Sequence, residues 1–361
     1  MTSAGTKTSF AYDKLIDVFE TSIINPKAAF CFGCDYRVPV MHGLLDKNFI
    51  DKLRMSPSYN EESFAREYMS LWSGAADDSW FNFDKLQKYR KLKNPEWKRV
   101  NGLKPNQFYL LSTDVGRLND QTVCCIFKVT IDGTKYRCIL ANIYVLGRTP
   151  ETKPFEKQAI DLKKLIGLYQ PKEVVIDTNG LGLGLADEMI KVQMDEFGNT
   201  YPAYGFTNDD DYKKIQPKNA INILYGIKAN SKLNSKIHGN AYARLSSGLV
   251  RFLIKEQEAK SALLSTKVGA RMNIEQRVKR LMPHEMTTKL FEEMANLRLK
   301  KTGSEDVVLE RINSRFPKDK YSAFSYGLWR IKELEEEAYK KQSRRGLIGN
   351  RQLVFYTEGV Y

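Results

Sequence analysis

QFYLLSTDVG, residues 107–116, decides the fold, because apolar and β-branched residues lead into an aspartate and then a glycine. This stretch predicts a buried strand that ends on Asp114. Two similar stretches follow at 122–131 and 136–146, and Asp132-Gly133 between them is a turn signal for a β-hairpin. The three segments together predict an antiparallel meander.

A second pattern adds a parallel strand to this meander. Residues 155–169 have the apolar spacing of a helix, and EVVID at 173–177 is a short apolar strand that ends on Asp177. A strand, a helix and a further strand in this order predict a right-handed crossover and a parallel pairing. We therefore expect an α/β fold with a mixed sheet flanked by helices.

Three aspartates stand where this sheet would bring them together. Asp114 and Asp177 end strands, and Asp319 precedes a long final helix predicted from about 320 to 337. Ligands bind at the carboxyl ends of neighbouring strands in such sheets. A group of like charges attracts hard divalent ions such as Mg²⁺, and two ions about 4 Å apart can activate water on a phosphodiester. The alternative is that each is an ordinary helix cap or loop acid, and Asp319 also suits a helix N-terminus.

The sequence around these aspartates resembles the nuclease motifs of phage terminase large subunits. STDVG (112–116) followed by Asp120-Gln-Thr resembles the first motif, VIDTNGLG (175–182) the second, and KDKYSA (318–323) the third. Residues 29–45 and 63–74 resemble segments between the motor ATPase and the nuclease, and residues 2–6 resemble the ATPase coupling motif. The resemblance thus covers nearly the whole chain.

The resemblance implies an RNase H-like fold and a division into three parts. Residues 1–104 would be a helical lead-in resembling the end of the terminase motor ATPase, 105–342 the nuclease domain, and 343–361 a polar C-terminal tail. It also implies that Asp114, Asp177 and Asp319 are catalytic and hold two ions of Mg²⁺ or Mn²⁺, with Asp120 as an auxiliary metal ligand.

The family's activity is expected to be cutting of concatemeric double-stranded viral DNA during genome packaging. The expected partners are the portal protein and the small terminase subunit, in the host cell cytoplasm and transiently on the procapsid. No Gly-x-x-x-x-Gly-Lys-Ser/Thr loop is present, and GLGLG at 180–184 lacks the lysine. The motor ATPase is therefore expected on another part of a longer protein or on another polypeptide, and Gly180 and Gly182 are expected to form a sharp turn.

The composition favours a polyanionic partner. Lys and Arg total 57 against 43 acidic residues, a net charge of +14. The stretch 259–301 is basic, and its predicted DNA-binding residues, which could instead form a solvated helix face, are Lys267, Arg271, Arg277, Lys279 and Arg280. The sequence has no uninterrupted apolar run of about 18 residues, so it predicts no membrane span. The odd count of five cysteines favours a reducing cytosol.

Some predictions rest on weaker patterns. We expect helices over 61–72 and 83–98, a hairpin around 237–254, and a solvated loop rather than a metal site at the acidic run 209–211. Two other functions stay open: another RNase H-like nuclease of the resolvase or transposase type, and a non-catalytic module that docks on DNA or the portal. The docking module predicts that the three acids never converge.

Overall fold

The structure is a computed structural model that describes residues 4–5, 10–56, 61–72, 79–116, 121–147, 154–300, 306–314 and 316–351. The chain forms two units: one comprises residues 1–87, 294–299 and 310–313, and the other comprises 88–293, 300–309 and 314–361. The division expected after residues 104 and 342 stays a prediction.

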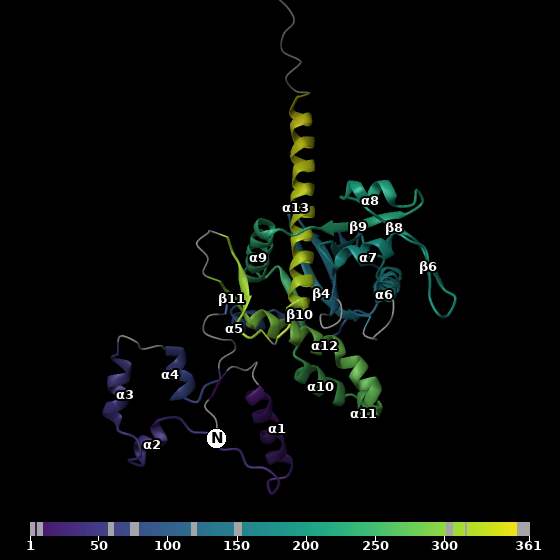
Figure 1. Cartoon of the computed structure of the whole chain (residues 1–361). Helices are drawn as coiled ribbons and strands as arrows, with labels where there is room; N and C mark the ends of the chain where they lie inside the picture. The colour runs from purple at the N-terminus through teal and green to yellow at the C-terminus, as the bar shows by residue number, and fades with distance from the viewer. Residues whose placement is uncertain are drawn as a thin grey trace, which may run out of the picture. The chain divides into compact units, whose positions relative to one another are not determined.

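The smaller unit is mainly helical. Its elements are α1 (Phe10–Ile24), α2 (Arg37–Met41), α3 (Lys47–Arg54), α4 (Glu61–Glu67), α5 (Phe83–Gln87), β11 (Leu297–Leu299) and most of β12 (Leu309–Arg311) (Figure 1). The helices predicted over 61–72 and 83–98 are therefore shorter than expected. The second ends early because residues 90–92 form a strand with a partner distant in the sequence.

The larger unit is built on an eight-stranded mixed sheet with the order β1-β10-β4-β3-β2-β5-β9-β8. β2, β3 and β4 form the predicted antiparallel meander, and β5 pairs with β2 in parallel, as predicted. The fold class expected from the sequence is thus confirmed. The strands are β1 (Arg90–Leu92), β2 (Gln107–Asp114), β3 (Thr122–Asp132), β4 (Lys135–Leu146), β5 (Glu173–Asp177), β8 (Tyr204–Phe206), β9 (Ile221–Ile227) and β10 (Val250–Leu253).

The prediction of a hairpin around 237–254 was wrong. Residues 231–246 form helix α9 (Ser231–Ser246), and β10 is the one strand within the predicted range 237–254, all of which the structure describes. Ile237, Ala241 and Leu245 are buried at intervals of four residues, which is the helical period. The side chain of Asn230 accepts a hydrogen bond from the backbone N–H of Leu233 and caps this helix.

Helices cover both faces of the sheet. On one face, α6 (Pro154–Tyr169) and α7 (Gly182–Met189) pack on a core that includes Tyr109 and Leu111. On the other, α13 (Asp319–Arg351) lies so close that a Cβ on Gly327 would be 2.3 Å from Phe127 Cε2 (Figure 1). The remaining elements are β6 (Gln193–Met194), β7 (Thr200–Tyr201), α8 (Asp210–Ile215), α10 (Glu256–Leu264), α11 (Lys267–Arg271) and α12 (Ile274–Ala295).

α13 extends to Arg351, well past the end predicted near residue 337. Within the described ranges, no helix has the length and apolar character that a membrane crossing requires.

Candidate functional site

Asp114 and Asp177 end adjacent parallel strands in the same register. Thr113 of β2 pairs with Ile176 of β5, so the two aspartates occupy the next row, on strands about 4.8 Å apart. Side chains alternate along a strand, which places Asp114 on the same face as Ser112. Ser112 lies against Gly327 of α13, so this face is the one that α13 covers.

α13 runs antiparallel to β5 and begins beyond its end. Tyr326 donates a hydrogen bond of 3.2 Å to Asp177 at the end of β5, and Arg330 donates one of 2.7 Å to Glu173 at its start. Asp319, the first residue of α13, therefore lies at the edge where β2 and β5 end. Its Oδ2 accepts a hydrogen bond of 3.1 Å from the backbone N–H of Gln121, which lies between β2 and β3.

The charges of Asp177 and Asp319 affect the pKa of Asp114. Burial raises the pKa of Asp114 well above its usual value, and the charges of Asp177 and Asp319 raise it further, while Lys318 opposes the shift. Burial also raises the pKa of Asp177, against hydrogen bonds from the Asn179 backbone and Tyr326 that lower it. The edge is therefore a half-buried group of like charges.

The residues fit a divalent cation by donor type and by charge. Carboxylate oxygens are the ligands that Mg²⁺ and Mn²⁺ prefer, and a cation would relieve the repulsion on Asp114. Within the described ranges, however, no three His, Cys, Asp or Glu side chains form a closed ligand group. The acids are thus close enough to repel one another without being arranged as ligands, and the predicted ligand Asp120 lies outside the described residues.

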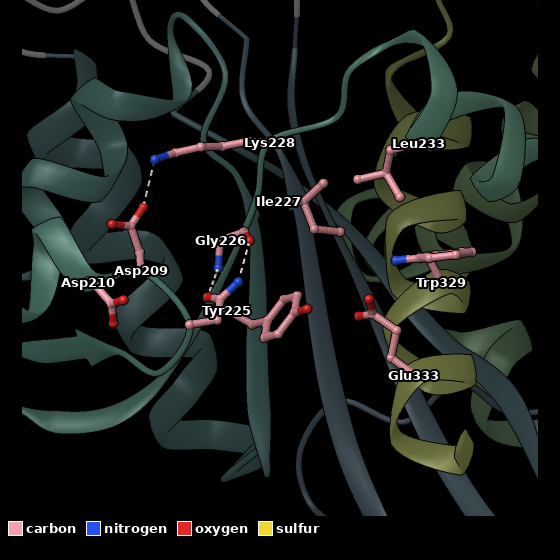
Figure 2. A pocket seen from close by; sticks show the side chains of 10 residues that line it. Asp209, Asp210, Tyr225, Gly226, Ile227, Lys228, Leu233, Trp329 and Glu333 are labelled. Atoms are coloured by element: carbon pink, nitrogen blue, oxygen red, sulfur yellow. Dashed lines mark hydrogen bonds and ion pairs between the residues drawn. The ribbon is translucent and has the colours of Figure 1, made fainter. Parts of the chain in front are cut away.

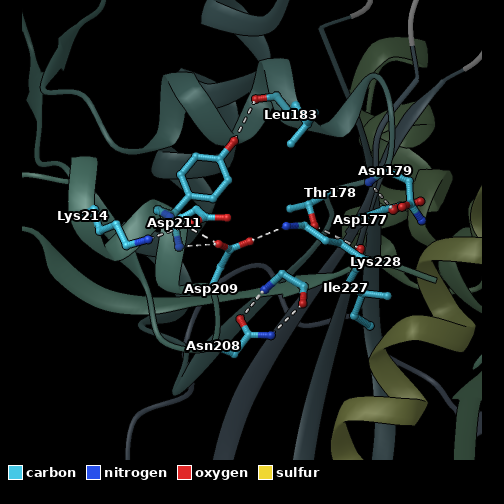
Figure 3. Close-up of polar contacts among 12 residues, drawn as sticks. Asp177, Thr178, Asn179, Leu183, Asn208, Asp209, Asp211, Lys214, Ile227 and Lys228 are labelled. Atoms are coloured by element: carbon cyan, nitrogen blue, oxygen red, sulfur yellow. Dashed lines mark hydrogen bonds and ion pairs between the residues drawn. The ribbon is translucent and has the colours of Figure 1, made fainter. Parts of the chain in front are cut away.

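The turn after Asp177 is sharp, as the two glycines predicted. Gly180 has φ +53°, and a Cβ on Gly182 would lie 1.7 Å from the backbone oxygen of Asp177. Figure 3 shows how this turn is fixed to the neighbouring strand: Thr178 donates to the Ile227 carbonyl from its backbone (2.9 Å) and from its hydroxyl (3.2 Å). The backbone that carries Asp177 is therefore held rigidly.

A pocket of about 410 Å³ opens beside this turn, at the ends of β8 and β9. Figure 2 shows Asp209 and Lys228 on one side of β9, and Trp329 and Glu333 of α13 on the other. The other lining residues are Asn208, Asp210, Tyr225, Gly226, Ile227 and Leu233. The pocket belongs to the same edge of the sheet as Asp177, because Asp177 pairs with Ile227.

The acidic run 209–211 begins a helix, so the prediction of a solvated loop was wrong. Asp209 is buried and caps α8 by accepting hydrogen bonds from the backbone N–H groups of Asp211 (3.1 Å) and Tyr212 (3.2 Å). Its other oxygen lies 2.8 Å from Lys228 Nζ (Figure 3). Asp209 thus has a full set of protein partners.

Several residues beside the acids were not predicted from the sequence. Glu293 of α12 forms a buried ion pair with Lys320 at 3.0 Å. His238 Nδ1 lies 3.0 Å from the hydroxyl of Tyr321, and burial, with a smaller effect of Lys318, lowers the pKa of His238 to about 4. These contacts join elements that are remote in sequence, which no local pattern records.

The five predicted DNA-binding residues lie together on α11 and α12. Arg277 donates a hydrogen bond of 2.8 Å to the Ala270 carbonyl and fixes α12 to α11. The other four are exposed: Lys267, Arg271, Lys279 and Arg280. Arg280 lies about 20 Å along α12 from Glu293, at 1.5 Å per residue.

Comparison with solved structures finds low similarity over most of the chain. One match is the large terminase nuclease from thermophilic phage G20c with bound magnesium: 16% identity, 68% of this chain, 95% of that chain and a TM-score of 0.38. Another is the g2p nuclease domain from bacteriophage SPP1 with bound Mn: 13% identity, 67% of this chain, 97% of that chain and a TM-score of 0.32. Both are large terminases.

A third match is the HK97 bacteriophage large terminase, with 10% identity and a TM-score of 0.38. The match covers 87% of this chain but 60% of the HK97 protein. No protein-family model and no curated protein matches the sequence. The solved structures are of the family whose motifs the sequence resembles.

Proposed function

We propose that the chain is a metal-dependent endonuclease that cuts concatemeric double-stranded viral DNA during genome packaging. One observation carries the proposal: β2, β5 and α13 bring Asp114, Asp177 and Asp319 to one edge of the sheet, on the face that α13 covers. The order of the three motifs in the sequence supports it independently.

Each residue of the site has a proposed part. Asp114 and Asp177 would hold the metal from adjacent strands, Asp319 would hold it from α13, and Asp120 would assist. When bound, a pair of Mg²⁺ or Mn²⁺ ions supplies an activated water and stabilises the leaving oxygen. Tyr326 orients the Asp177 carboxylate through its hydrogen bond.

Double-stranded DNA is the proposed substrate, held through its phosphates by the exposed basic residues of α11 and α12. We expect little sequence specificity, because phosphate contacts carry no base information. The portal protein, the small terminase subunit and a motor ATPase domain outside this chain are the proposed partners, and the host cell cytoplasm is the proposed location. A resolvase or transposase type of nuclease would use the same acids.

A non-catalytic docking module is the second candidate. The observation that favours it is that the part of the chain the structure describes contains no closed group of three metal ligands. Such a module would bind DNA through the same basic residues without cutting it.

Plasmid cleavage in Mg²⁺ or Mn²⁺ separates the two candidates. We expect the wild type to cut, and D114A and D177A to lose the activity while keeping their circular dichroism spectrum. D211A is the matched control, because Asp211 is an exposed acid that pairs with Lys214 on α8. Wild type that is folded but does not cut in either metal would favour the docking module.

A further inference from the structure

The first turn of α13 makes a hydrogen bond with a side chain of another helix. Lys318 precedes the helix, and its ammonium has donors but no acceptor. The first N–H groups of a helix have no partner within the helix. Glu293 of α12 provides one, because its Oε2 accepts a hydrogen bond of 2.9 Å from the backbone N–H of Tyr321. α12 thus caps α13 from outside.

The same carboxylate also holds the neighbouring side chain. Glu293 Oε1 lies 3.0 Å from Lys320 Nζ, and the two residues are only 2% and 3% exposed. Lys320 Nζ is also 3.4 Å from Gln121 Oε1. Glu293 therefore holds residues 320 and 321, the two that directly follow Asp319, by one side-chain contact and one backbone contact.

Asp319 is held from two sides by these contacts. The Gln121 backbone fixes its carboxylate from the side of the sheet, and Glu293 fixes its helix from the side of α12. A pocket of about 280 Å³, lined in part by Gln121, Glu293 and Lys320, lies at this junction. Residues 320 and 321 are themselves buried, so close packing and these polar contacts together fix the start of α13.

We propose that Glu293 is a positioning residue for Asp319, and that it sets the affinity of the acidic edge for a divalent cation. The inference rests on the proposed function, because it assumes that Asp319 is a metal ligand. It also gives α12 two roles at its two ends: Lys279 and Arg280 hold DNA near one end, and Glu293 holds the third acid at the other.

Paired substitutions separate the capping contact from the ion pair. E293Q/K320M removes both charges together, so no buried charge is left alone, and it keeps an amide oxygen for the Tyr321 N–H. E293L/K320M removes the acceptor as well. E285Q is the control, because Glu285 lies on the same helix and pairs with Lys289 at the surface. The measurement is Mn²⁺ affinity from the electron paramagnetic resonance signal of free Mn²⁺, with circular dichroism for folding.

We expect E293L/K320M to bind Mn²⁺ at least about tenfold more weakly than wild type, as for the loss of residues that orient a metal ligand. We expect E293Q/K320M to stay within about threefold of wild type and E285Q to be unchanged, because both keep the Tyr321 contact. A folded E293L/K320M that binds as wild type does would overturn the inference. If it does not fold, E293D gives the test: it keeps the charge but shortens the reach, so wild-type affinity in E293D would overturn the inference.

D114A tells which proposal fails. If wild type binds Mn²⁺, D114A loses it and E293L/K320M retains it, the inference alone is wrong. If wild type binds no Mn²⁺, the proposed function is wrong and the inference falls with it.

Discussion

Asp114 ends one strand of the sheet and Asp209 follows another, but their surroundings act on them in opposite ways. Burial and the charges of Asp177 and Asp319 raise the pKa of Asp114 well above its usual value. Burial also acts to raise the pKa of Asp209, but the hydrogen bond from Lys228 and those from the α8 backbone outweigh it and hold the value low.

The role of an acid at the end of a strand therefore depends on its partners rather than on its position. Asp209 has a cation and two backbone N–H groups, so its charge is compensated within the protein. Asp114 lies near other carboxylates, so a bound metal ion is needed to compensate its charge. The two acids should therefore respond differently to substitution, to pH and to metal.

The largest effect concerns cutting. If Asp319 and Asp114 hold the same metal site, D319N should lower the plasmid cleavage rate about 10- to 100-fold. D209N should change the rate by less than about threefold, because asparagine also caps helices. Rates at saturating Mn²⁺ measure this. Equal losses in the two variants would remove the distinction between the two sites.

The next effect is on stability without metal. D209A removes the cap of α8 and the contact with Lys228, so the free energy of unfolding should fall by about 1–2 kcal/mol. D114N should not lower it, because the amide removes the repulsion among the acids. Urea unfolding in chelator measures both. A large loss of stability in D114N would show that the Asp114 charge is compensated in the folded protein.

The pH dependence of stability should have opposite signs at the two sites. Asp114 has a raised pKa in the folded state, so the folded protein binds its proton more tightly, and wild type should lose stability relative to D114N as the pH rises above 3.8. Asp209 has a lowered pKa, so the advantage of wild type over D209N should vanish as the pH falls below 3.8. Each slope is at most about 1.4 kcal/mol per pH unit. Unfolding in chelator across this range measures it, and parallel profiles for the three proteins would contradict the contrast.

The smallest expected effect is on DNA affinity, measured in a variant that is expected not to cut DNA. K279A/R280A in a D114N background should weaken binding several-fold and reduce the salt slope of log K by about 1.8, or about 0.9 per lost phosphate contact. K213A/K214A is the control, because these lysines pair with Asp210 and Asp211. Binding titrations over a range of salt concentrations measure the slope, and equal slopes would place the DNA elsewhere.

Local patterns were sufficient for the meander and for two of the acids. Stretches rich in aromatic and β-branched residues and the Asp132-Gly133 turn predicted β2, β3 and β4, and the strand–helix–strand order predicted the parallel β5. Parallel pairing then places Asp114 and Asp177 in one row. Their roles as ligands stay predictions.

The remaining features depend on contacts between distant residues. β1 forms only because Arg90 pairs with Phe252 on β10, and its guanidinium donates to the Leu253 carbonyl. Glu293 caps α13 from another helix, and nothing in the sequence around it marks an acceptor for Tyr321. The cap at Asn230, by contrast, is a local signal that could have prevented the mistaken hairpin at 237–254.

Crystals grown with Mn²⁺, with anomalous scattering recorded, would show directly whether Asp114 and Asp177 hold a metal ion. We expect an anomalous peak about 2.1 Å from carboxylate oxygens of both Asp114 and Asp177, and none at Asp209. Well-ordered Asp114 and Asp177 side chains with no peak between them would contradict it.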